Sequence, residues 1–342
     1  MANRIFDNFT ECYISLLDEV YNSYDFISSP RNQKIKEKLG VAFTIKNPRH
    51  RYPFVLGRKF SPTYLAAELL WYLSGDNCTT WISKYSKFWS RISDDGKTAN
   101  SAYGARLFRE NPVIAGGRLN QWKYIKSELL RDPDSRRAVM HIRVPDDSID
   151  AKLDVPCTLA LQFFIRNEKL HMITSMRSSD LIFGIAYDIP AFTFFQEILA
   201  LDLGVDVGSY THMSNSLHIY ERHFSMVEDI LCESNTSSSL AAAKAYGPMP
   251  SLEVSSCDQA SRDFWVSKLM NFEDELQHQK TIDQVVNAYS RFKEVMTKRE
   301  YVWADIATLL SAHRIKRVSD KSQEKLLNPC FNYPGFIFGL GE

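Results

Sequence analysis

The sequence predicts an α+β protein with strands in the first part of the chain and helices in the C-terminal part. Apolar residues recur at three- and four-residue steps in 5–24, alternate with their neighbours in 155–176, and return to helical spacing toward the C-terminus. With 342 residues, the chain is long enough for roughly two domains. We therefore expect a main domain at 1–233, a linker at 234–251 and a helical extension at 252–342.

The first elements follow from local patterns. An amphipathic helix is expected at 5–24, followed by a polar loop at 28–34. Ser61 followed by Pro62 is typical of the cap and first residue of a helix, which we expect to continue through Leu73. The second helix is thus predicted by its start signal and by Gly75 after its end.

The middle of the chain predicts strands. Alternating apolar residues in 155–176 lie on both sides of Asn167–Glu168, which indicates two strands joined by a short turn. A helix at 189–202, a strand at 204–210 and a helix at 217–230 are expected to follow.

The C-terminal part begins with a change of composition. A serine run, an alanine run and a Gly-Pro-Met-Pro segment predict the linker. Beyond it, helical spacing at 260–278, 281–298 and 300–316 predicts the extension.

Composition excludes several classes. The chain is 44% apolar and 24% charged, which excludes a disordered or fibrous protein. Its 41 basic and 41 acidic residues give no global basic field, so a nucleic-acid partner has no support. No apolar run reaches the roughly 18 residues of a membrane span, and the start lacks an apolar signal segment. We expect a cytoplasmic protein with no membrane partner.

The six cysteines form no C-x-x-C pair, so neither a zinc knuckle nor a thioredoxin-like motif is present, and we expect reduced thiols and no metal. Cys157 follows Pro156, and on its own such a cysteine is more often packing than a nucleophile.

Three charged features carry potential chemistry. Glu68 lies in an apolar helical segment, where an unpaired charge is costly. Arg136 and Arg137 form a basic pair, which fits either a solvated surface or a phosphate. Arg177 and Ser178 open an Arg-Ser-Ser-Asp segment that suits an anion and a polar ring edge.

Taken together, six blocks resemble the thymidylate synthase family in order and spacing, from residue 1 to about 230. The blocks are Ala67–Asp76, Ala102–Gly104, Asp132–Arg137, Pro156–Cys157 with Leu161–Phe163, Met176–Asp180 with Gly184, and His218–Tyr220 with His223. The resemblance implies a large mixed β-sheet flanked by helices and a homodimer. It also implies two substrates, a pyrimidine nucleoside monophosphate and 5,10-methylenetetrahydrofolate, which donates a one-carbon unit.

The resemblance implies that Cys157 adds to C6 of the pyrimidine and makes C5 a carbon nucleophile that captures the one-carbon unit. This step needs a thiolate, and we expect nearby arginines to lower the pKa of the thiol. Arg136 and Arg137 would reach the partner subunit's phosphate site, while Arg177 and Ser178 would bind the phosphate within the subunit. Arg31 is a further phosphate candidate, although its flanks depart from the family's Gly/Thr-rich loop.

The remaining roles are implied in the same way. Glu68 would relay protons through water, and Tyr103 would help remove the proton from C5. Asp180, with Gly184, would meet the pterin and border the substrate. The resemblance also implies roles for Trp89 over the cofactor, and for His218 and Tyr220 at the sugar 3′-hydroxyl.

One departure bears on the base. Asp188 stands where the synthases have the asparagine that reads uracil. A carboxylate only accepts hydrogen bonds, so it can pair with the N4 amino group of cytosine but leaves O4 of uracil facing an anion. A proton on N3 of the cytosine adduct could also be shared with Asp188. The aspartate therefore favours cytosine.

With an aspartate at position 188, the sequence resembles the branch of deoxycytidylate and cytidylate hydroxymethylases, in which water captures the methylene on C5. Thr158, Asn215–Ser216 and the C-terminal segment 336–342 also depart from the synthases. We hypothesise that a looser C-terminal lid admits the water.

We therefore expect a folate-dependent hydroxymethyltransferase acting on dCMP or CMP. The alternatives are a thymidylate synthase, a deoxycytidylate methyltransferase and an inactive nucleotide-binding homologue. The sequence does not decide between ribose and deoxyribose.

Overall fold

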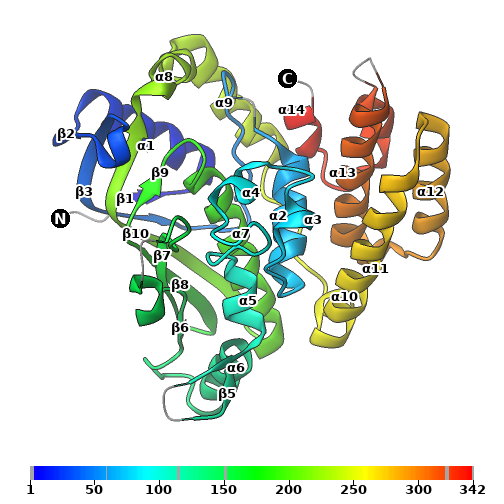
Figure 1. The fold of residues 1–342 in the computed structure, drawn as a ribbon, viewed down its shortest axis with the longest axis horizontal. Helices are drawn as coiled ribbons and strands as arrows, with labels where there is room; N and C mark the ends of the chain where they lie inside the picture. Colours follow the sequence, from blue (N-terminus) through cyan, green and yellow to red (C-terminus); the bar gives the residue numbers. More distant parts are fainter. Residues whose placement is uncertain (1–3, 59, 114–115, 150–151, 320–322, 341–342) are drawn as a thin grey trace. The chain divides into compact units, whose positions relative to one another are not determined.

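The computed structural model describes residues 4–58, 60–113, 116–149, 152–319 and 323–340 (Figure 1). The chain forms two compact units. One, here called the sheet unit, comprises Met1–Phe60 and Arg106–Met249. The other, the helical unit, comprises Ser61–Ala105 and Pro250–Glu342.

The sheet unit is built on one mixed sheet (Figure 1). The strands of its main path lie in the order β1 (Arg4–Phe6), β3 (Ile35–Ile45), β10 (Asp206–Tyr220), β8 (Lys169–Met176), β7 (Thr158–Arg166) and β6 (Val139–His141). Two short strands, β2 (Phe26–Ser28) and β9 (Ser179–Asp180), pair with β3 and β10 respectively. Because β10 is parallel to β8 and antiparallel to β3, the predicted mixed sheet is confirmed.

The hairpin of β7 and β8 follows from local sequence. Asn167 and Glu168 adopt positive φ angles of 51° and 58°, the left-handed turn conformation that matches the twist of two antiparallel strands. Alternate residues such as Leu161, Phe163 and Met172 are completely buried. The period of two thus places one face of the hairpin in the core.

Helices of the sheet unit pack on this core. They are α1 (Phe9–Asn22), α6 (Gln121–Arg131), α7 (Ile185–Leu203), α8 (Phe224–Leu231) and α9 (Glu233–Tyr246), with a small hairpin of β4 (Glu110–Pro112) and β5 (Arg118–Asn120). Helix α7 is apolar nearly all round and contacts both β8 and β10. A helix with this composition is stable only when buried, so α7 forms the centre of the unit.

The helical unit contains the predicted extension. Its helices are α2 (Pro62–Leu73), α3 (Thr79–Ile82), α4 (Phe88–Ile92), α10 (Val254–Cys257), α11 (Gln259–His278), α12 (Ile282–Glu294), α13 (Tyr301–Val318) and α14 (Phe336–Leu340). The short helix α5 (Tyr103–Phe108) begins in this unit and ends in the sheet unit. The oxygen of Ser61 accepts a hydrogen bond from the N–H of Tyr64 at 3.2 Å, which confirms the predicted start of α2.

Two predicted helices differ from the structure at their ends. Ile5 and Phe6, predicted as the start of a helix, belong to β1, which pairs with β3, and the helix starts at Phe9. Residues 217–220, also predicted as helix, are the end of β10, and the helix starts at Phe224. In both cases β3, an 11-residue strand, supplies hydrogen-bond partners that are distant in sequence.

The predicted linker is mostly helical, because α9 covers Glu233–Tyr246. Its alanine run has the highest intrinsic helix propensity. Ser239 is completely buried, and its hydroxyl donates to the Asn235 carbonyl and accepts from the Leu56 N–H. The serines therefore serve packing and hydrogen bonding within the sheet unit. Among the residues described, no helix is long and apolar enough to cross a membrane.

A buried ion pair supports a stability prediction. Glu197 on α7 is 1% exposed, and its carboxylate pairs with Arg51 and, at 2.6 Å, with Arg49. Burial would raise the pKa of Glu197, but the two arginines hold it below its ordinary value. The stabilisation is therefore complete above the ordinary pKa of glutamate and is lost as the pH falls through the lowered one.

Glu197→Ala should lower the free energy of unfolding by about 3–5 kcal/mol, because it leaves the buried Arg51 unpaired. Urea unfolding at neutral pH measures this loss. Asp7→Ala, which removes the exposed partner of Lys46, is the matched control and should change stability by less than about 1 kcal/mol. Equal losses in the two variants would contradict the argument.

Candidate active site

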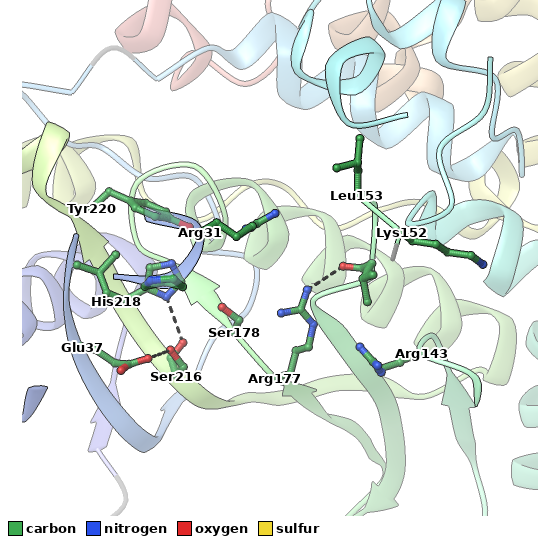
Figure 2. Close-up of a pocket in the computed structure, with 13 residues that line it drawn as sticks. Arg31, Glu37, Arg143, Lys152, Leu153, Arg177, Ser178, Ser216, His218 and Tyr220 are labelled. Carbon is green, nitrogen blue, oxygen red and sulfur yellow. Dashed lines mark hydrogen bonds between the residues drawn. The ribbon is translucent and has the colours of Figure 1, made fainter. Parts of the chain in front are cut away.

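A pocket of about 540 Å³ opens on the sheet unit (Figure 2). One wall comes from the register of two antiparallel strands, because Ile35 lies opposite Tyr220 and Glu37 lies opposite His218. Residues that lie opposite each other point to the same face of a sheet. The register thus directs side chains of β3 and β10 together into the pocket.

Four cationic side chains line the pocket: Arg31, Arg143, Lys152 and Arg177. In Figure 2, Glu37, Ser216, His218 and Tyr220 lie on one side of Arg177, and Arg143 and Lys152 lie on the other. Such a concentration of guanidinium and ammonium groups suits an anionic ligand. Sequence reasoning missed Arg143 and Lys152, since neither belongs to a block shared with the family.

Arg31 reaches the pocket from an unusual backbone. Arg31 and Asn32 have φ angles of 52° and 60°, in the left-handed region that glycine prefers. The family's loop is rich in glycine and threonine, and here the chain adopts the left-handed turn without glycine. Non-glycine residues held in this region are often found at functional sites.

Cys157 lies immediately before β7, beside Arg177. The Arg177 side chain donates from Nε to the Pro156 carbonyl at 2.9 Å and from Nη2 to the Val155 carbonyl at 2.8 Å. Nη2 also approaches Cys157 Sγ at 3.5 Å. The arginine is thus fixed by the backbone that leads to the thiol.

The arginines act to lower the pKa of this thiol, as predicted, but burial outweighs them. Burial raises the pKa of Cys157 above its ordinary value. Arg177 and Arg31 act to lower the pKa, whereas Asp188 and Asp154 act to raise it. The thiol is therefore protonated at neutral pH, and to act as a nucleophile it would have to lose this proton.

Asp180, Gly184 and Asp188 are brought together by a tight turn. The Gly184 N–H donates to the Asp180 carbonyl at 3.0 Å, and the Asp188 N–H donates to the Gly184 carbonyl at 3.0 Å. A Cβ on Gly184 would lie 2.8 Å from the Asp180 carbonyl oxygen and 3.5 Å from Oδ2 of Asp188. Only glycine fits between the two carboxylate-bearing residues.

His218 and Tyr220, which the resemblance assigns to the sugar 3′-hydroxyl, lie together in the wall of the pocket. Their rings meet edge to face at 5.0 Å, and His218 is 5% exposed. Burial lowers the pKa of His218, so the ring is neutral at physiological pH. A neutral imidazole offers one donor and one acceptor, which suits a hydroxyl.

Arg136 and Arg137 do not reach this pocket. Both are exposed, in the loop between α6 and β6. Their backbone is held in place, since the Arg136 carbonyl accepts from Gln162 at 3.0 Å and the Arg137 N–H donates to Ser135 at 3.1 Å. Their role at a partner's phosphate stays a prediction.

In the helical unit, Glu68 is part of a polar chain. The Trp89 indole N–H donates to the Tyr64 hydroxyl at 3.0 Å, and that hydroxyl donates to Oε1 of Glu68 at 2.5 Å. Burial raises the pKa of Glu68 to about 7, although hydrogen bonds from Tyr64 and Tyr72 oppose the shift. A carboxyl group that titrates near neutrality suits proton transfer in both directions.

Tyr103 is positioned by its neighbour. A Cβ on Gly104 would lie 2.0 Å from the Tyr72 carbonyl oxygen, so glycine is required for this close approach to α2. The Tyr103 ring stacks on the Tyr72 ring at 5.4 Å. Packing against Tyr72 thus explains the glycine of the Ala-Tyr-Gly block, independently of the resemblance to the family.

Tyr64→Phe should raise the pKa of Glu68 by about one unit, because it removes a hydrogen bond to the charged form. NMR titration of side-chain-labelled glutamate measures the shift. Trp89→Phe, which removes the donor to Tyr64 but keeps the tyrosine, should give a smaller shift. An unchanged pKa in Tyr64→Phe would show that the tyrosine does not act on this carboxyl group.

The site residues predicted from the sequence fall into two groups, one in each unit. The sheet unit contributes Cys157, the pocket arginines, Ser178, Asp180, Gly184, Asp188, His218 and Tyr220, and the helical unit contributes Glu68, Trp89 and Tyr103. Among the described residues, no group of three or more histidine, cysteine, aspartate or glutamate side chains could hold a metal ion. The sheet unit thus contains a thiol, a cationic pocket and the Asp188 carboxylate, and the cations suit an anionic ligand.

The sequence profile described as thymidylate synthase matches residues 11–246, more than half of the chain. The protein belongs to the thymidylate synthase family, and the predicted family is confirmed.

Two relatives are phage enzymes. The deoxyuridylate hydroxymethyltransferase of Bacillus phage SP01 is 36% identical over 218 residues, covering 62% of this chain and 57% of that protein. The deoxycytidylate 5-hydroxymethyltransferase of Enterobacteria phage T4 is 29% identical over 216 residues, covering 60% of this chain and 83% of that protein. The matched region thus spans little more than half the length of the first relative.

Proposed function

We propose that the protein is a pyrimidine nucleotide 5-hydroxymethyltransferase that converts dCMP or CMP, 5,10-methylenetetrahydrofolate and water into the 5-hydroxymethyl nucleotide and tetrahydrofolate. The observation that carries the proposal is the carboxylate of Asp188. It lies beside Gly184 and close enough to Cys157 to raise the pKa of the thiol. A base attached to Cys157 would meet an acceptor that suits cytosine.

In this proposal, the protein's own residues prepare the base and manage the protons. Cys157 Sγ bonds to C6 and gives its proton away, which places negative charge on C5 and allows C5 to attack the one-carbon unit. Tyr103 accepts the C5 proton, and the electron pair left on C5 forms the exocyclic methylene as the bond from that carbon to the folate nitrogen breaks and tetrahydrofolate leaves. Glu68 exchanges protons with water. Water then adds to the methylene on C5, and Cys157 leaves C6.

Different groups of residues are proposed to bind the phosphate, the sugar and the folate. Arg31, Arg177 and Ser178 would hold the phosphate, and His218 with Tyr220 would hold the sugar. Trp89, Asp180 and Gly184 would hold the folate. The names of the two phage relatives support a hydroxymethyltransferase, and the protein is proposed to act in the cytoplasm.

We propose that the active form is a homodimer. Arg136 and Arg137 are exposed and held at their backbone, as side chains that complete a partner's phosphate site would be. In that assembly each phosphate site would gain two guanidinium groups.

A second candidate is hydroxymethylation of dUMP. It is favoured by the name of the SP01 relative, which shares more identity with this chain than the T4 enzyme does. A protonated Asp188 could donate to O4 of uracil, whereas the ionised form could not. The first turn of α7 contains Asp188, and the positive end of a helix favours the ionised form.

The test is to incubate the full chain with methylenetetrahydrofolate and, separately, with dCMP, CMP and dUMP, and to identify both products by mass spectrometry. A hydroxymethylated cytosine nucleotide with tetrahydrofolate supports the proposal, and the faster of dCMP and CMP identifies the sugar. Hydroxymethyl-dUMP supports the second candidate. Methylated dUMP with dihydrofolate would make the protein a thymidylate synthase, and methylated dCMP a methyltransferase. Absence of any product with bound nucleotide would favour an inactive homologue.

A further inference from the structure

Glu37 is a carboxylate in a pocket otherwise dominated by cations. Its side chain lines the same pocket as the four cationic side chains, on the side of His218 and Tyr220 (Figure 2). Among the described residues, no lysine or arginine lies within ion-pair distance of Glu37, so pairing with a cation does not explain its presence.

The carboxylate is held in place by two hydroxyl groups. Ser216 Oγ on β10 donates to Oε1 of Glu37, and Ser28 Oγ on β2 donates to Oε2 at 3.2 Å. A carboxylate has about four acceptor positions, and these bonds use two of them. Glu37 is therefore fixed in orientation while it keeps the capacity to accept from a ligand.

The strand register places this acceptor next to the sugar wall. Glu37 lies directly opposite His218 in the antiparallel pair of β3 and β10. The negative charge of Glu37 acts on the ring, opposing the burial that lowers the pKa of His218. The two side chains thus face the same small volume of the pocket.

A carboxylate at this position restricts the part of the ligand it can face. It repels a phosphate, and Arg143 and Lys152 lie beyond Arg177 as seen from Glu37, whereas Arg31 lies near Tyr220 (Figure 2). It offers no donor, so it can bind only a group with an O–H or N–H. In a nucleoside monophosphate whose phosphate contacts the cations, the remaining donors near His218 are the sugar hydroxyls.

We propose that Glu37 accepts a hydrogen bond from the 3′-hydroxyl of the bound nucleotide and is a specificity residue for the sugar. The inference rests on the proposed function only for the identity of the ligand as a nucleoside monophosphate. Of the two sugar hydroxyls, only the 3′-hydroxyl is present in both dCMP and CMP, so the proposal concerns this group.

The experiment compares dCMP with 2′,3′-dideoxy-CMP in the wild-type protein and in Glu37→Gln. Binding is measured by calorimetry without folate, and kcat and KM for dCMP are measured in parallel. In the wild-type protein, loss of the 3′-hydroxyl should weaken binding by about 10- to 100-fold, as expected for a hydrogen bond to a charged group. In Glu37→Gln this penalty should fall to less than about fivefold. KM for dCMP should rise in this variant, while kcat changes by less than about threefold.

Ser28→Ala is the matched control, because it removes one anchor of Glu37 and leaves the acceptor charged. In this variant, the logarithm of the ratio of the dissociation constants for 2′,3′-dideoxy-CMP and dCMP should be at least half of its wild-type value. If Glu37→Gln discriminates dCMP from the dideoxy nucleotide as strongly as the wild-type protein does, the inference is wrong. The binding comparison does not depend on turnover, so it can be made even if the proposed reaction does not occur. Failure of the proposed reaction would be seen separately, as the absence of product.

Discussion

Cys157→Ser should lower kcat for the nucleotide by roughly 10⁴-fold or more, the scale seen when an enzyme loses its nucleophile. A serine hydroxyl is far less acidic than a thiol, so it forms the attacking anion far less readily. The nearest cation, Arg177 at 3.5 Å from Sγ, favours an anion but cannot accept a proton. Nucleotide binding should change little, because the pocket cations are untouched.

The measurement is the initial rate of product formation, together with intact-protein mass spectrometry of a nucleotide adduct on Cys157. Cys232→Ser is the control, since Cys232 is an exposed free cysteine of the same chain and should be dispensable. If Cys157→Ser kept more than about one hundredth of the wild-type rate, the thiol would not be the nucleophile.

The raised pKa of Cys157 adds a pH dependence to the same prediction. Because burial keeps the thiol protonated, the thiolate fraction rises as the pH increases through the neutral range and above. We expect kcat/KM to rise with pH until Glu68 or another group limits the rate. A rate that is flat from pH 7 to about 9 would indicate that nucleotide binding itself lowers the pKa of the thiol.

Local chemistry accounts for the part of the fold that the sequence predicts. The cap at Ser61, the turn at Asn167–Glu168 and the periodicity of α11 to α13 involve neighbours within a few residues, and the structure has each of them. The end of β10 could not be predicted in this way. Its apolar residues fit a helix, and only pairing with β3, more than 170 residues earlier, makes them a strand.

The same limit applies to the site. Cys157, Asp188 and Glu68 stand in blocks that resemble a family, so the sequence alone could single them out. Glu37 and Arg143 belong to no such block, and their importance follows only from the pocket they line. The sequence also predicts that arginines lower the pKa of the Cys157 thiol, and they do, but it does not show that burial outweighs their charge.

Asp188→Asn should move the preference between cytosine and uracil nucleotides by roughly 100-fold or more in kcat/KM ratio. The amide donates as well as accepts, so it can pair with N3–H and O4 of uracil. In the wild-type protein, O4 would face an ionised carboxylate and would be left unpaired. For cytosine, the variant loses the anion that could share the proton on N3 of the Cys157 adduct. We therefore expect kcat/KM for dCMP to fall and that for dUMP to rise.

Kinetics with dCMP and dUMP at one pH measure the ratio, and Asp154→Asn separates charge from base reading. Asp154 is buried, and like Asp188 it raises the pKa of the Cys157 thiol. Removing either charge should ease formation of the thiolate for both nucleotides, but only Asp188→Asn should change the ratio between them. A change of ratio shared by both variants would mean that negative charge near the thiol, and not hydrogen bonding to the base edge, sets the preference. If neither variant changed the ratio, Asp188 would not read the base, and residues outside α7 would set the preference between dCMP and dUMP.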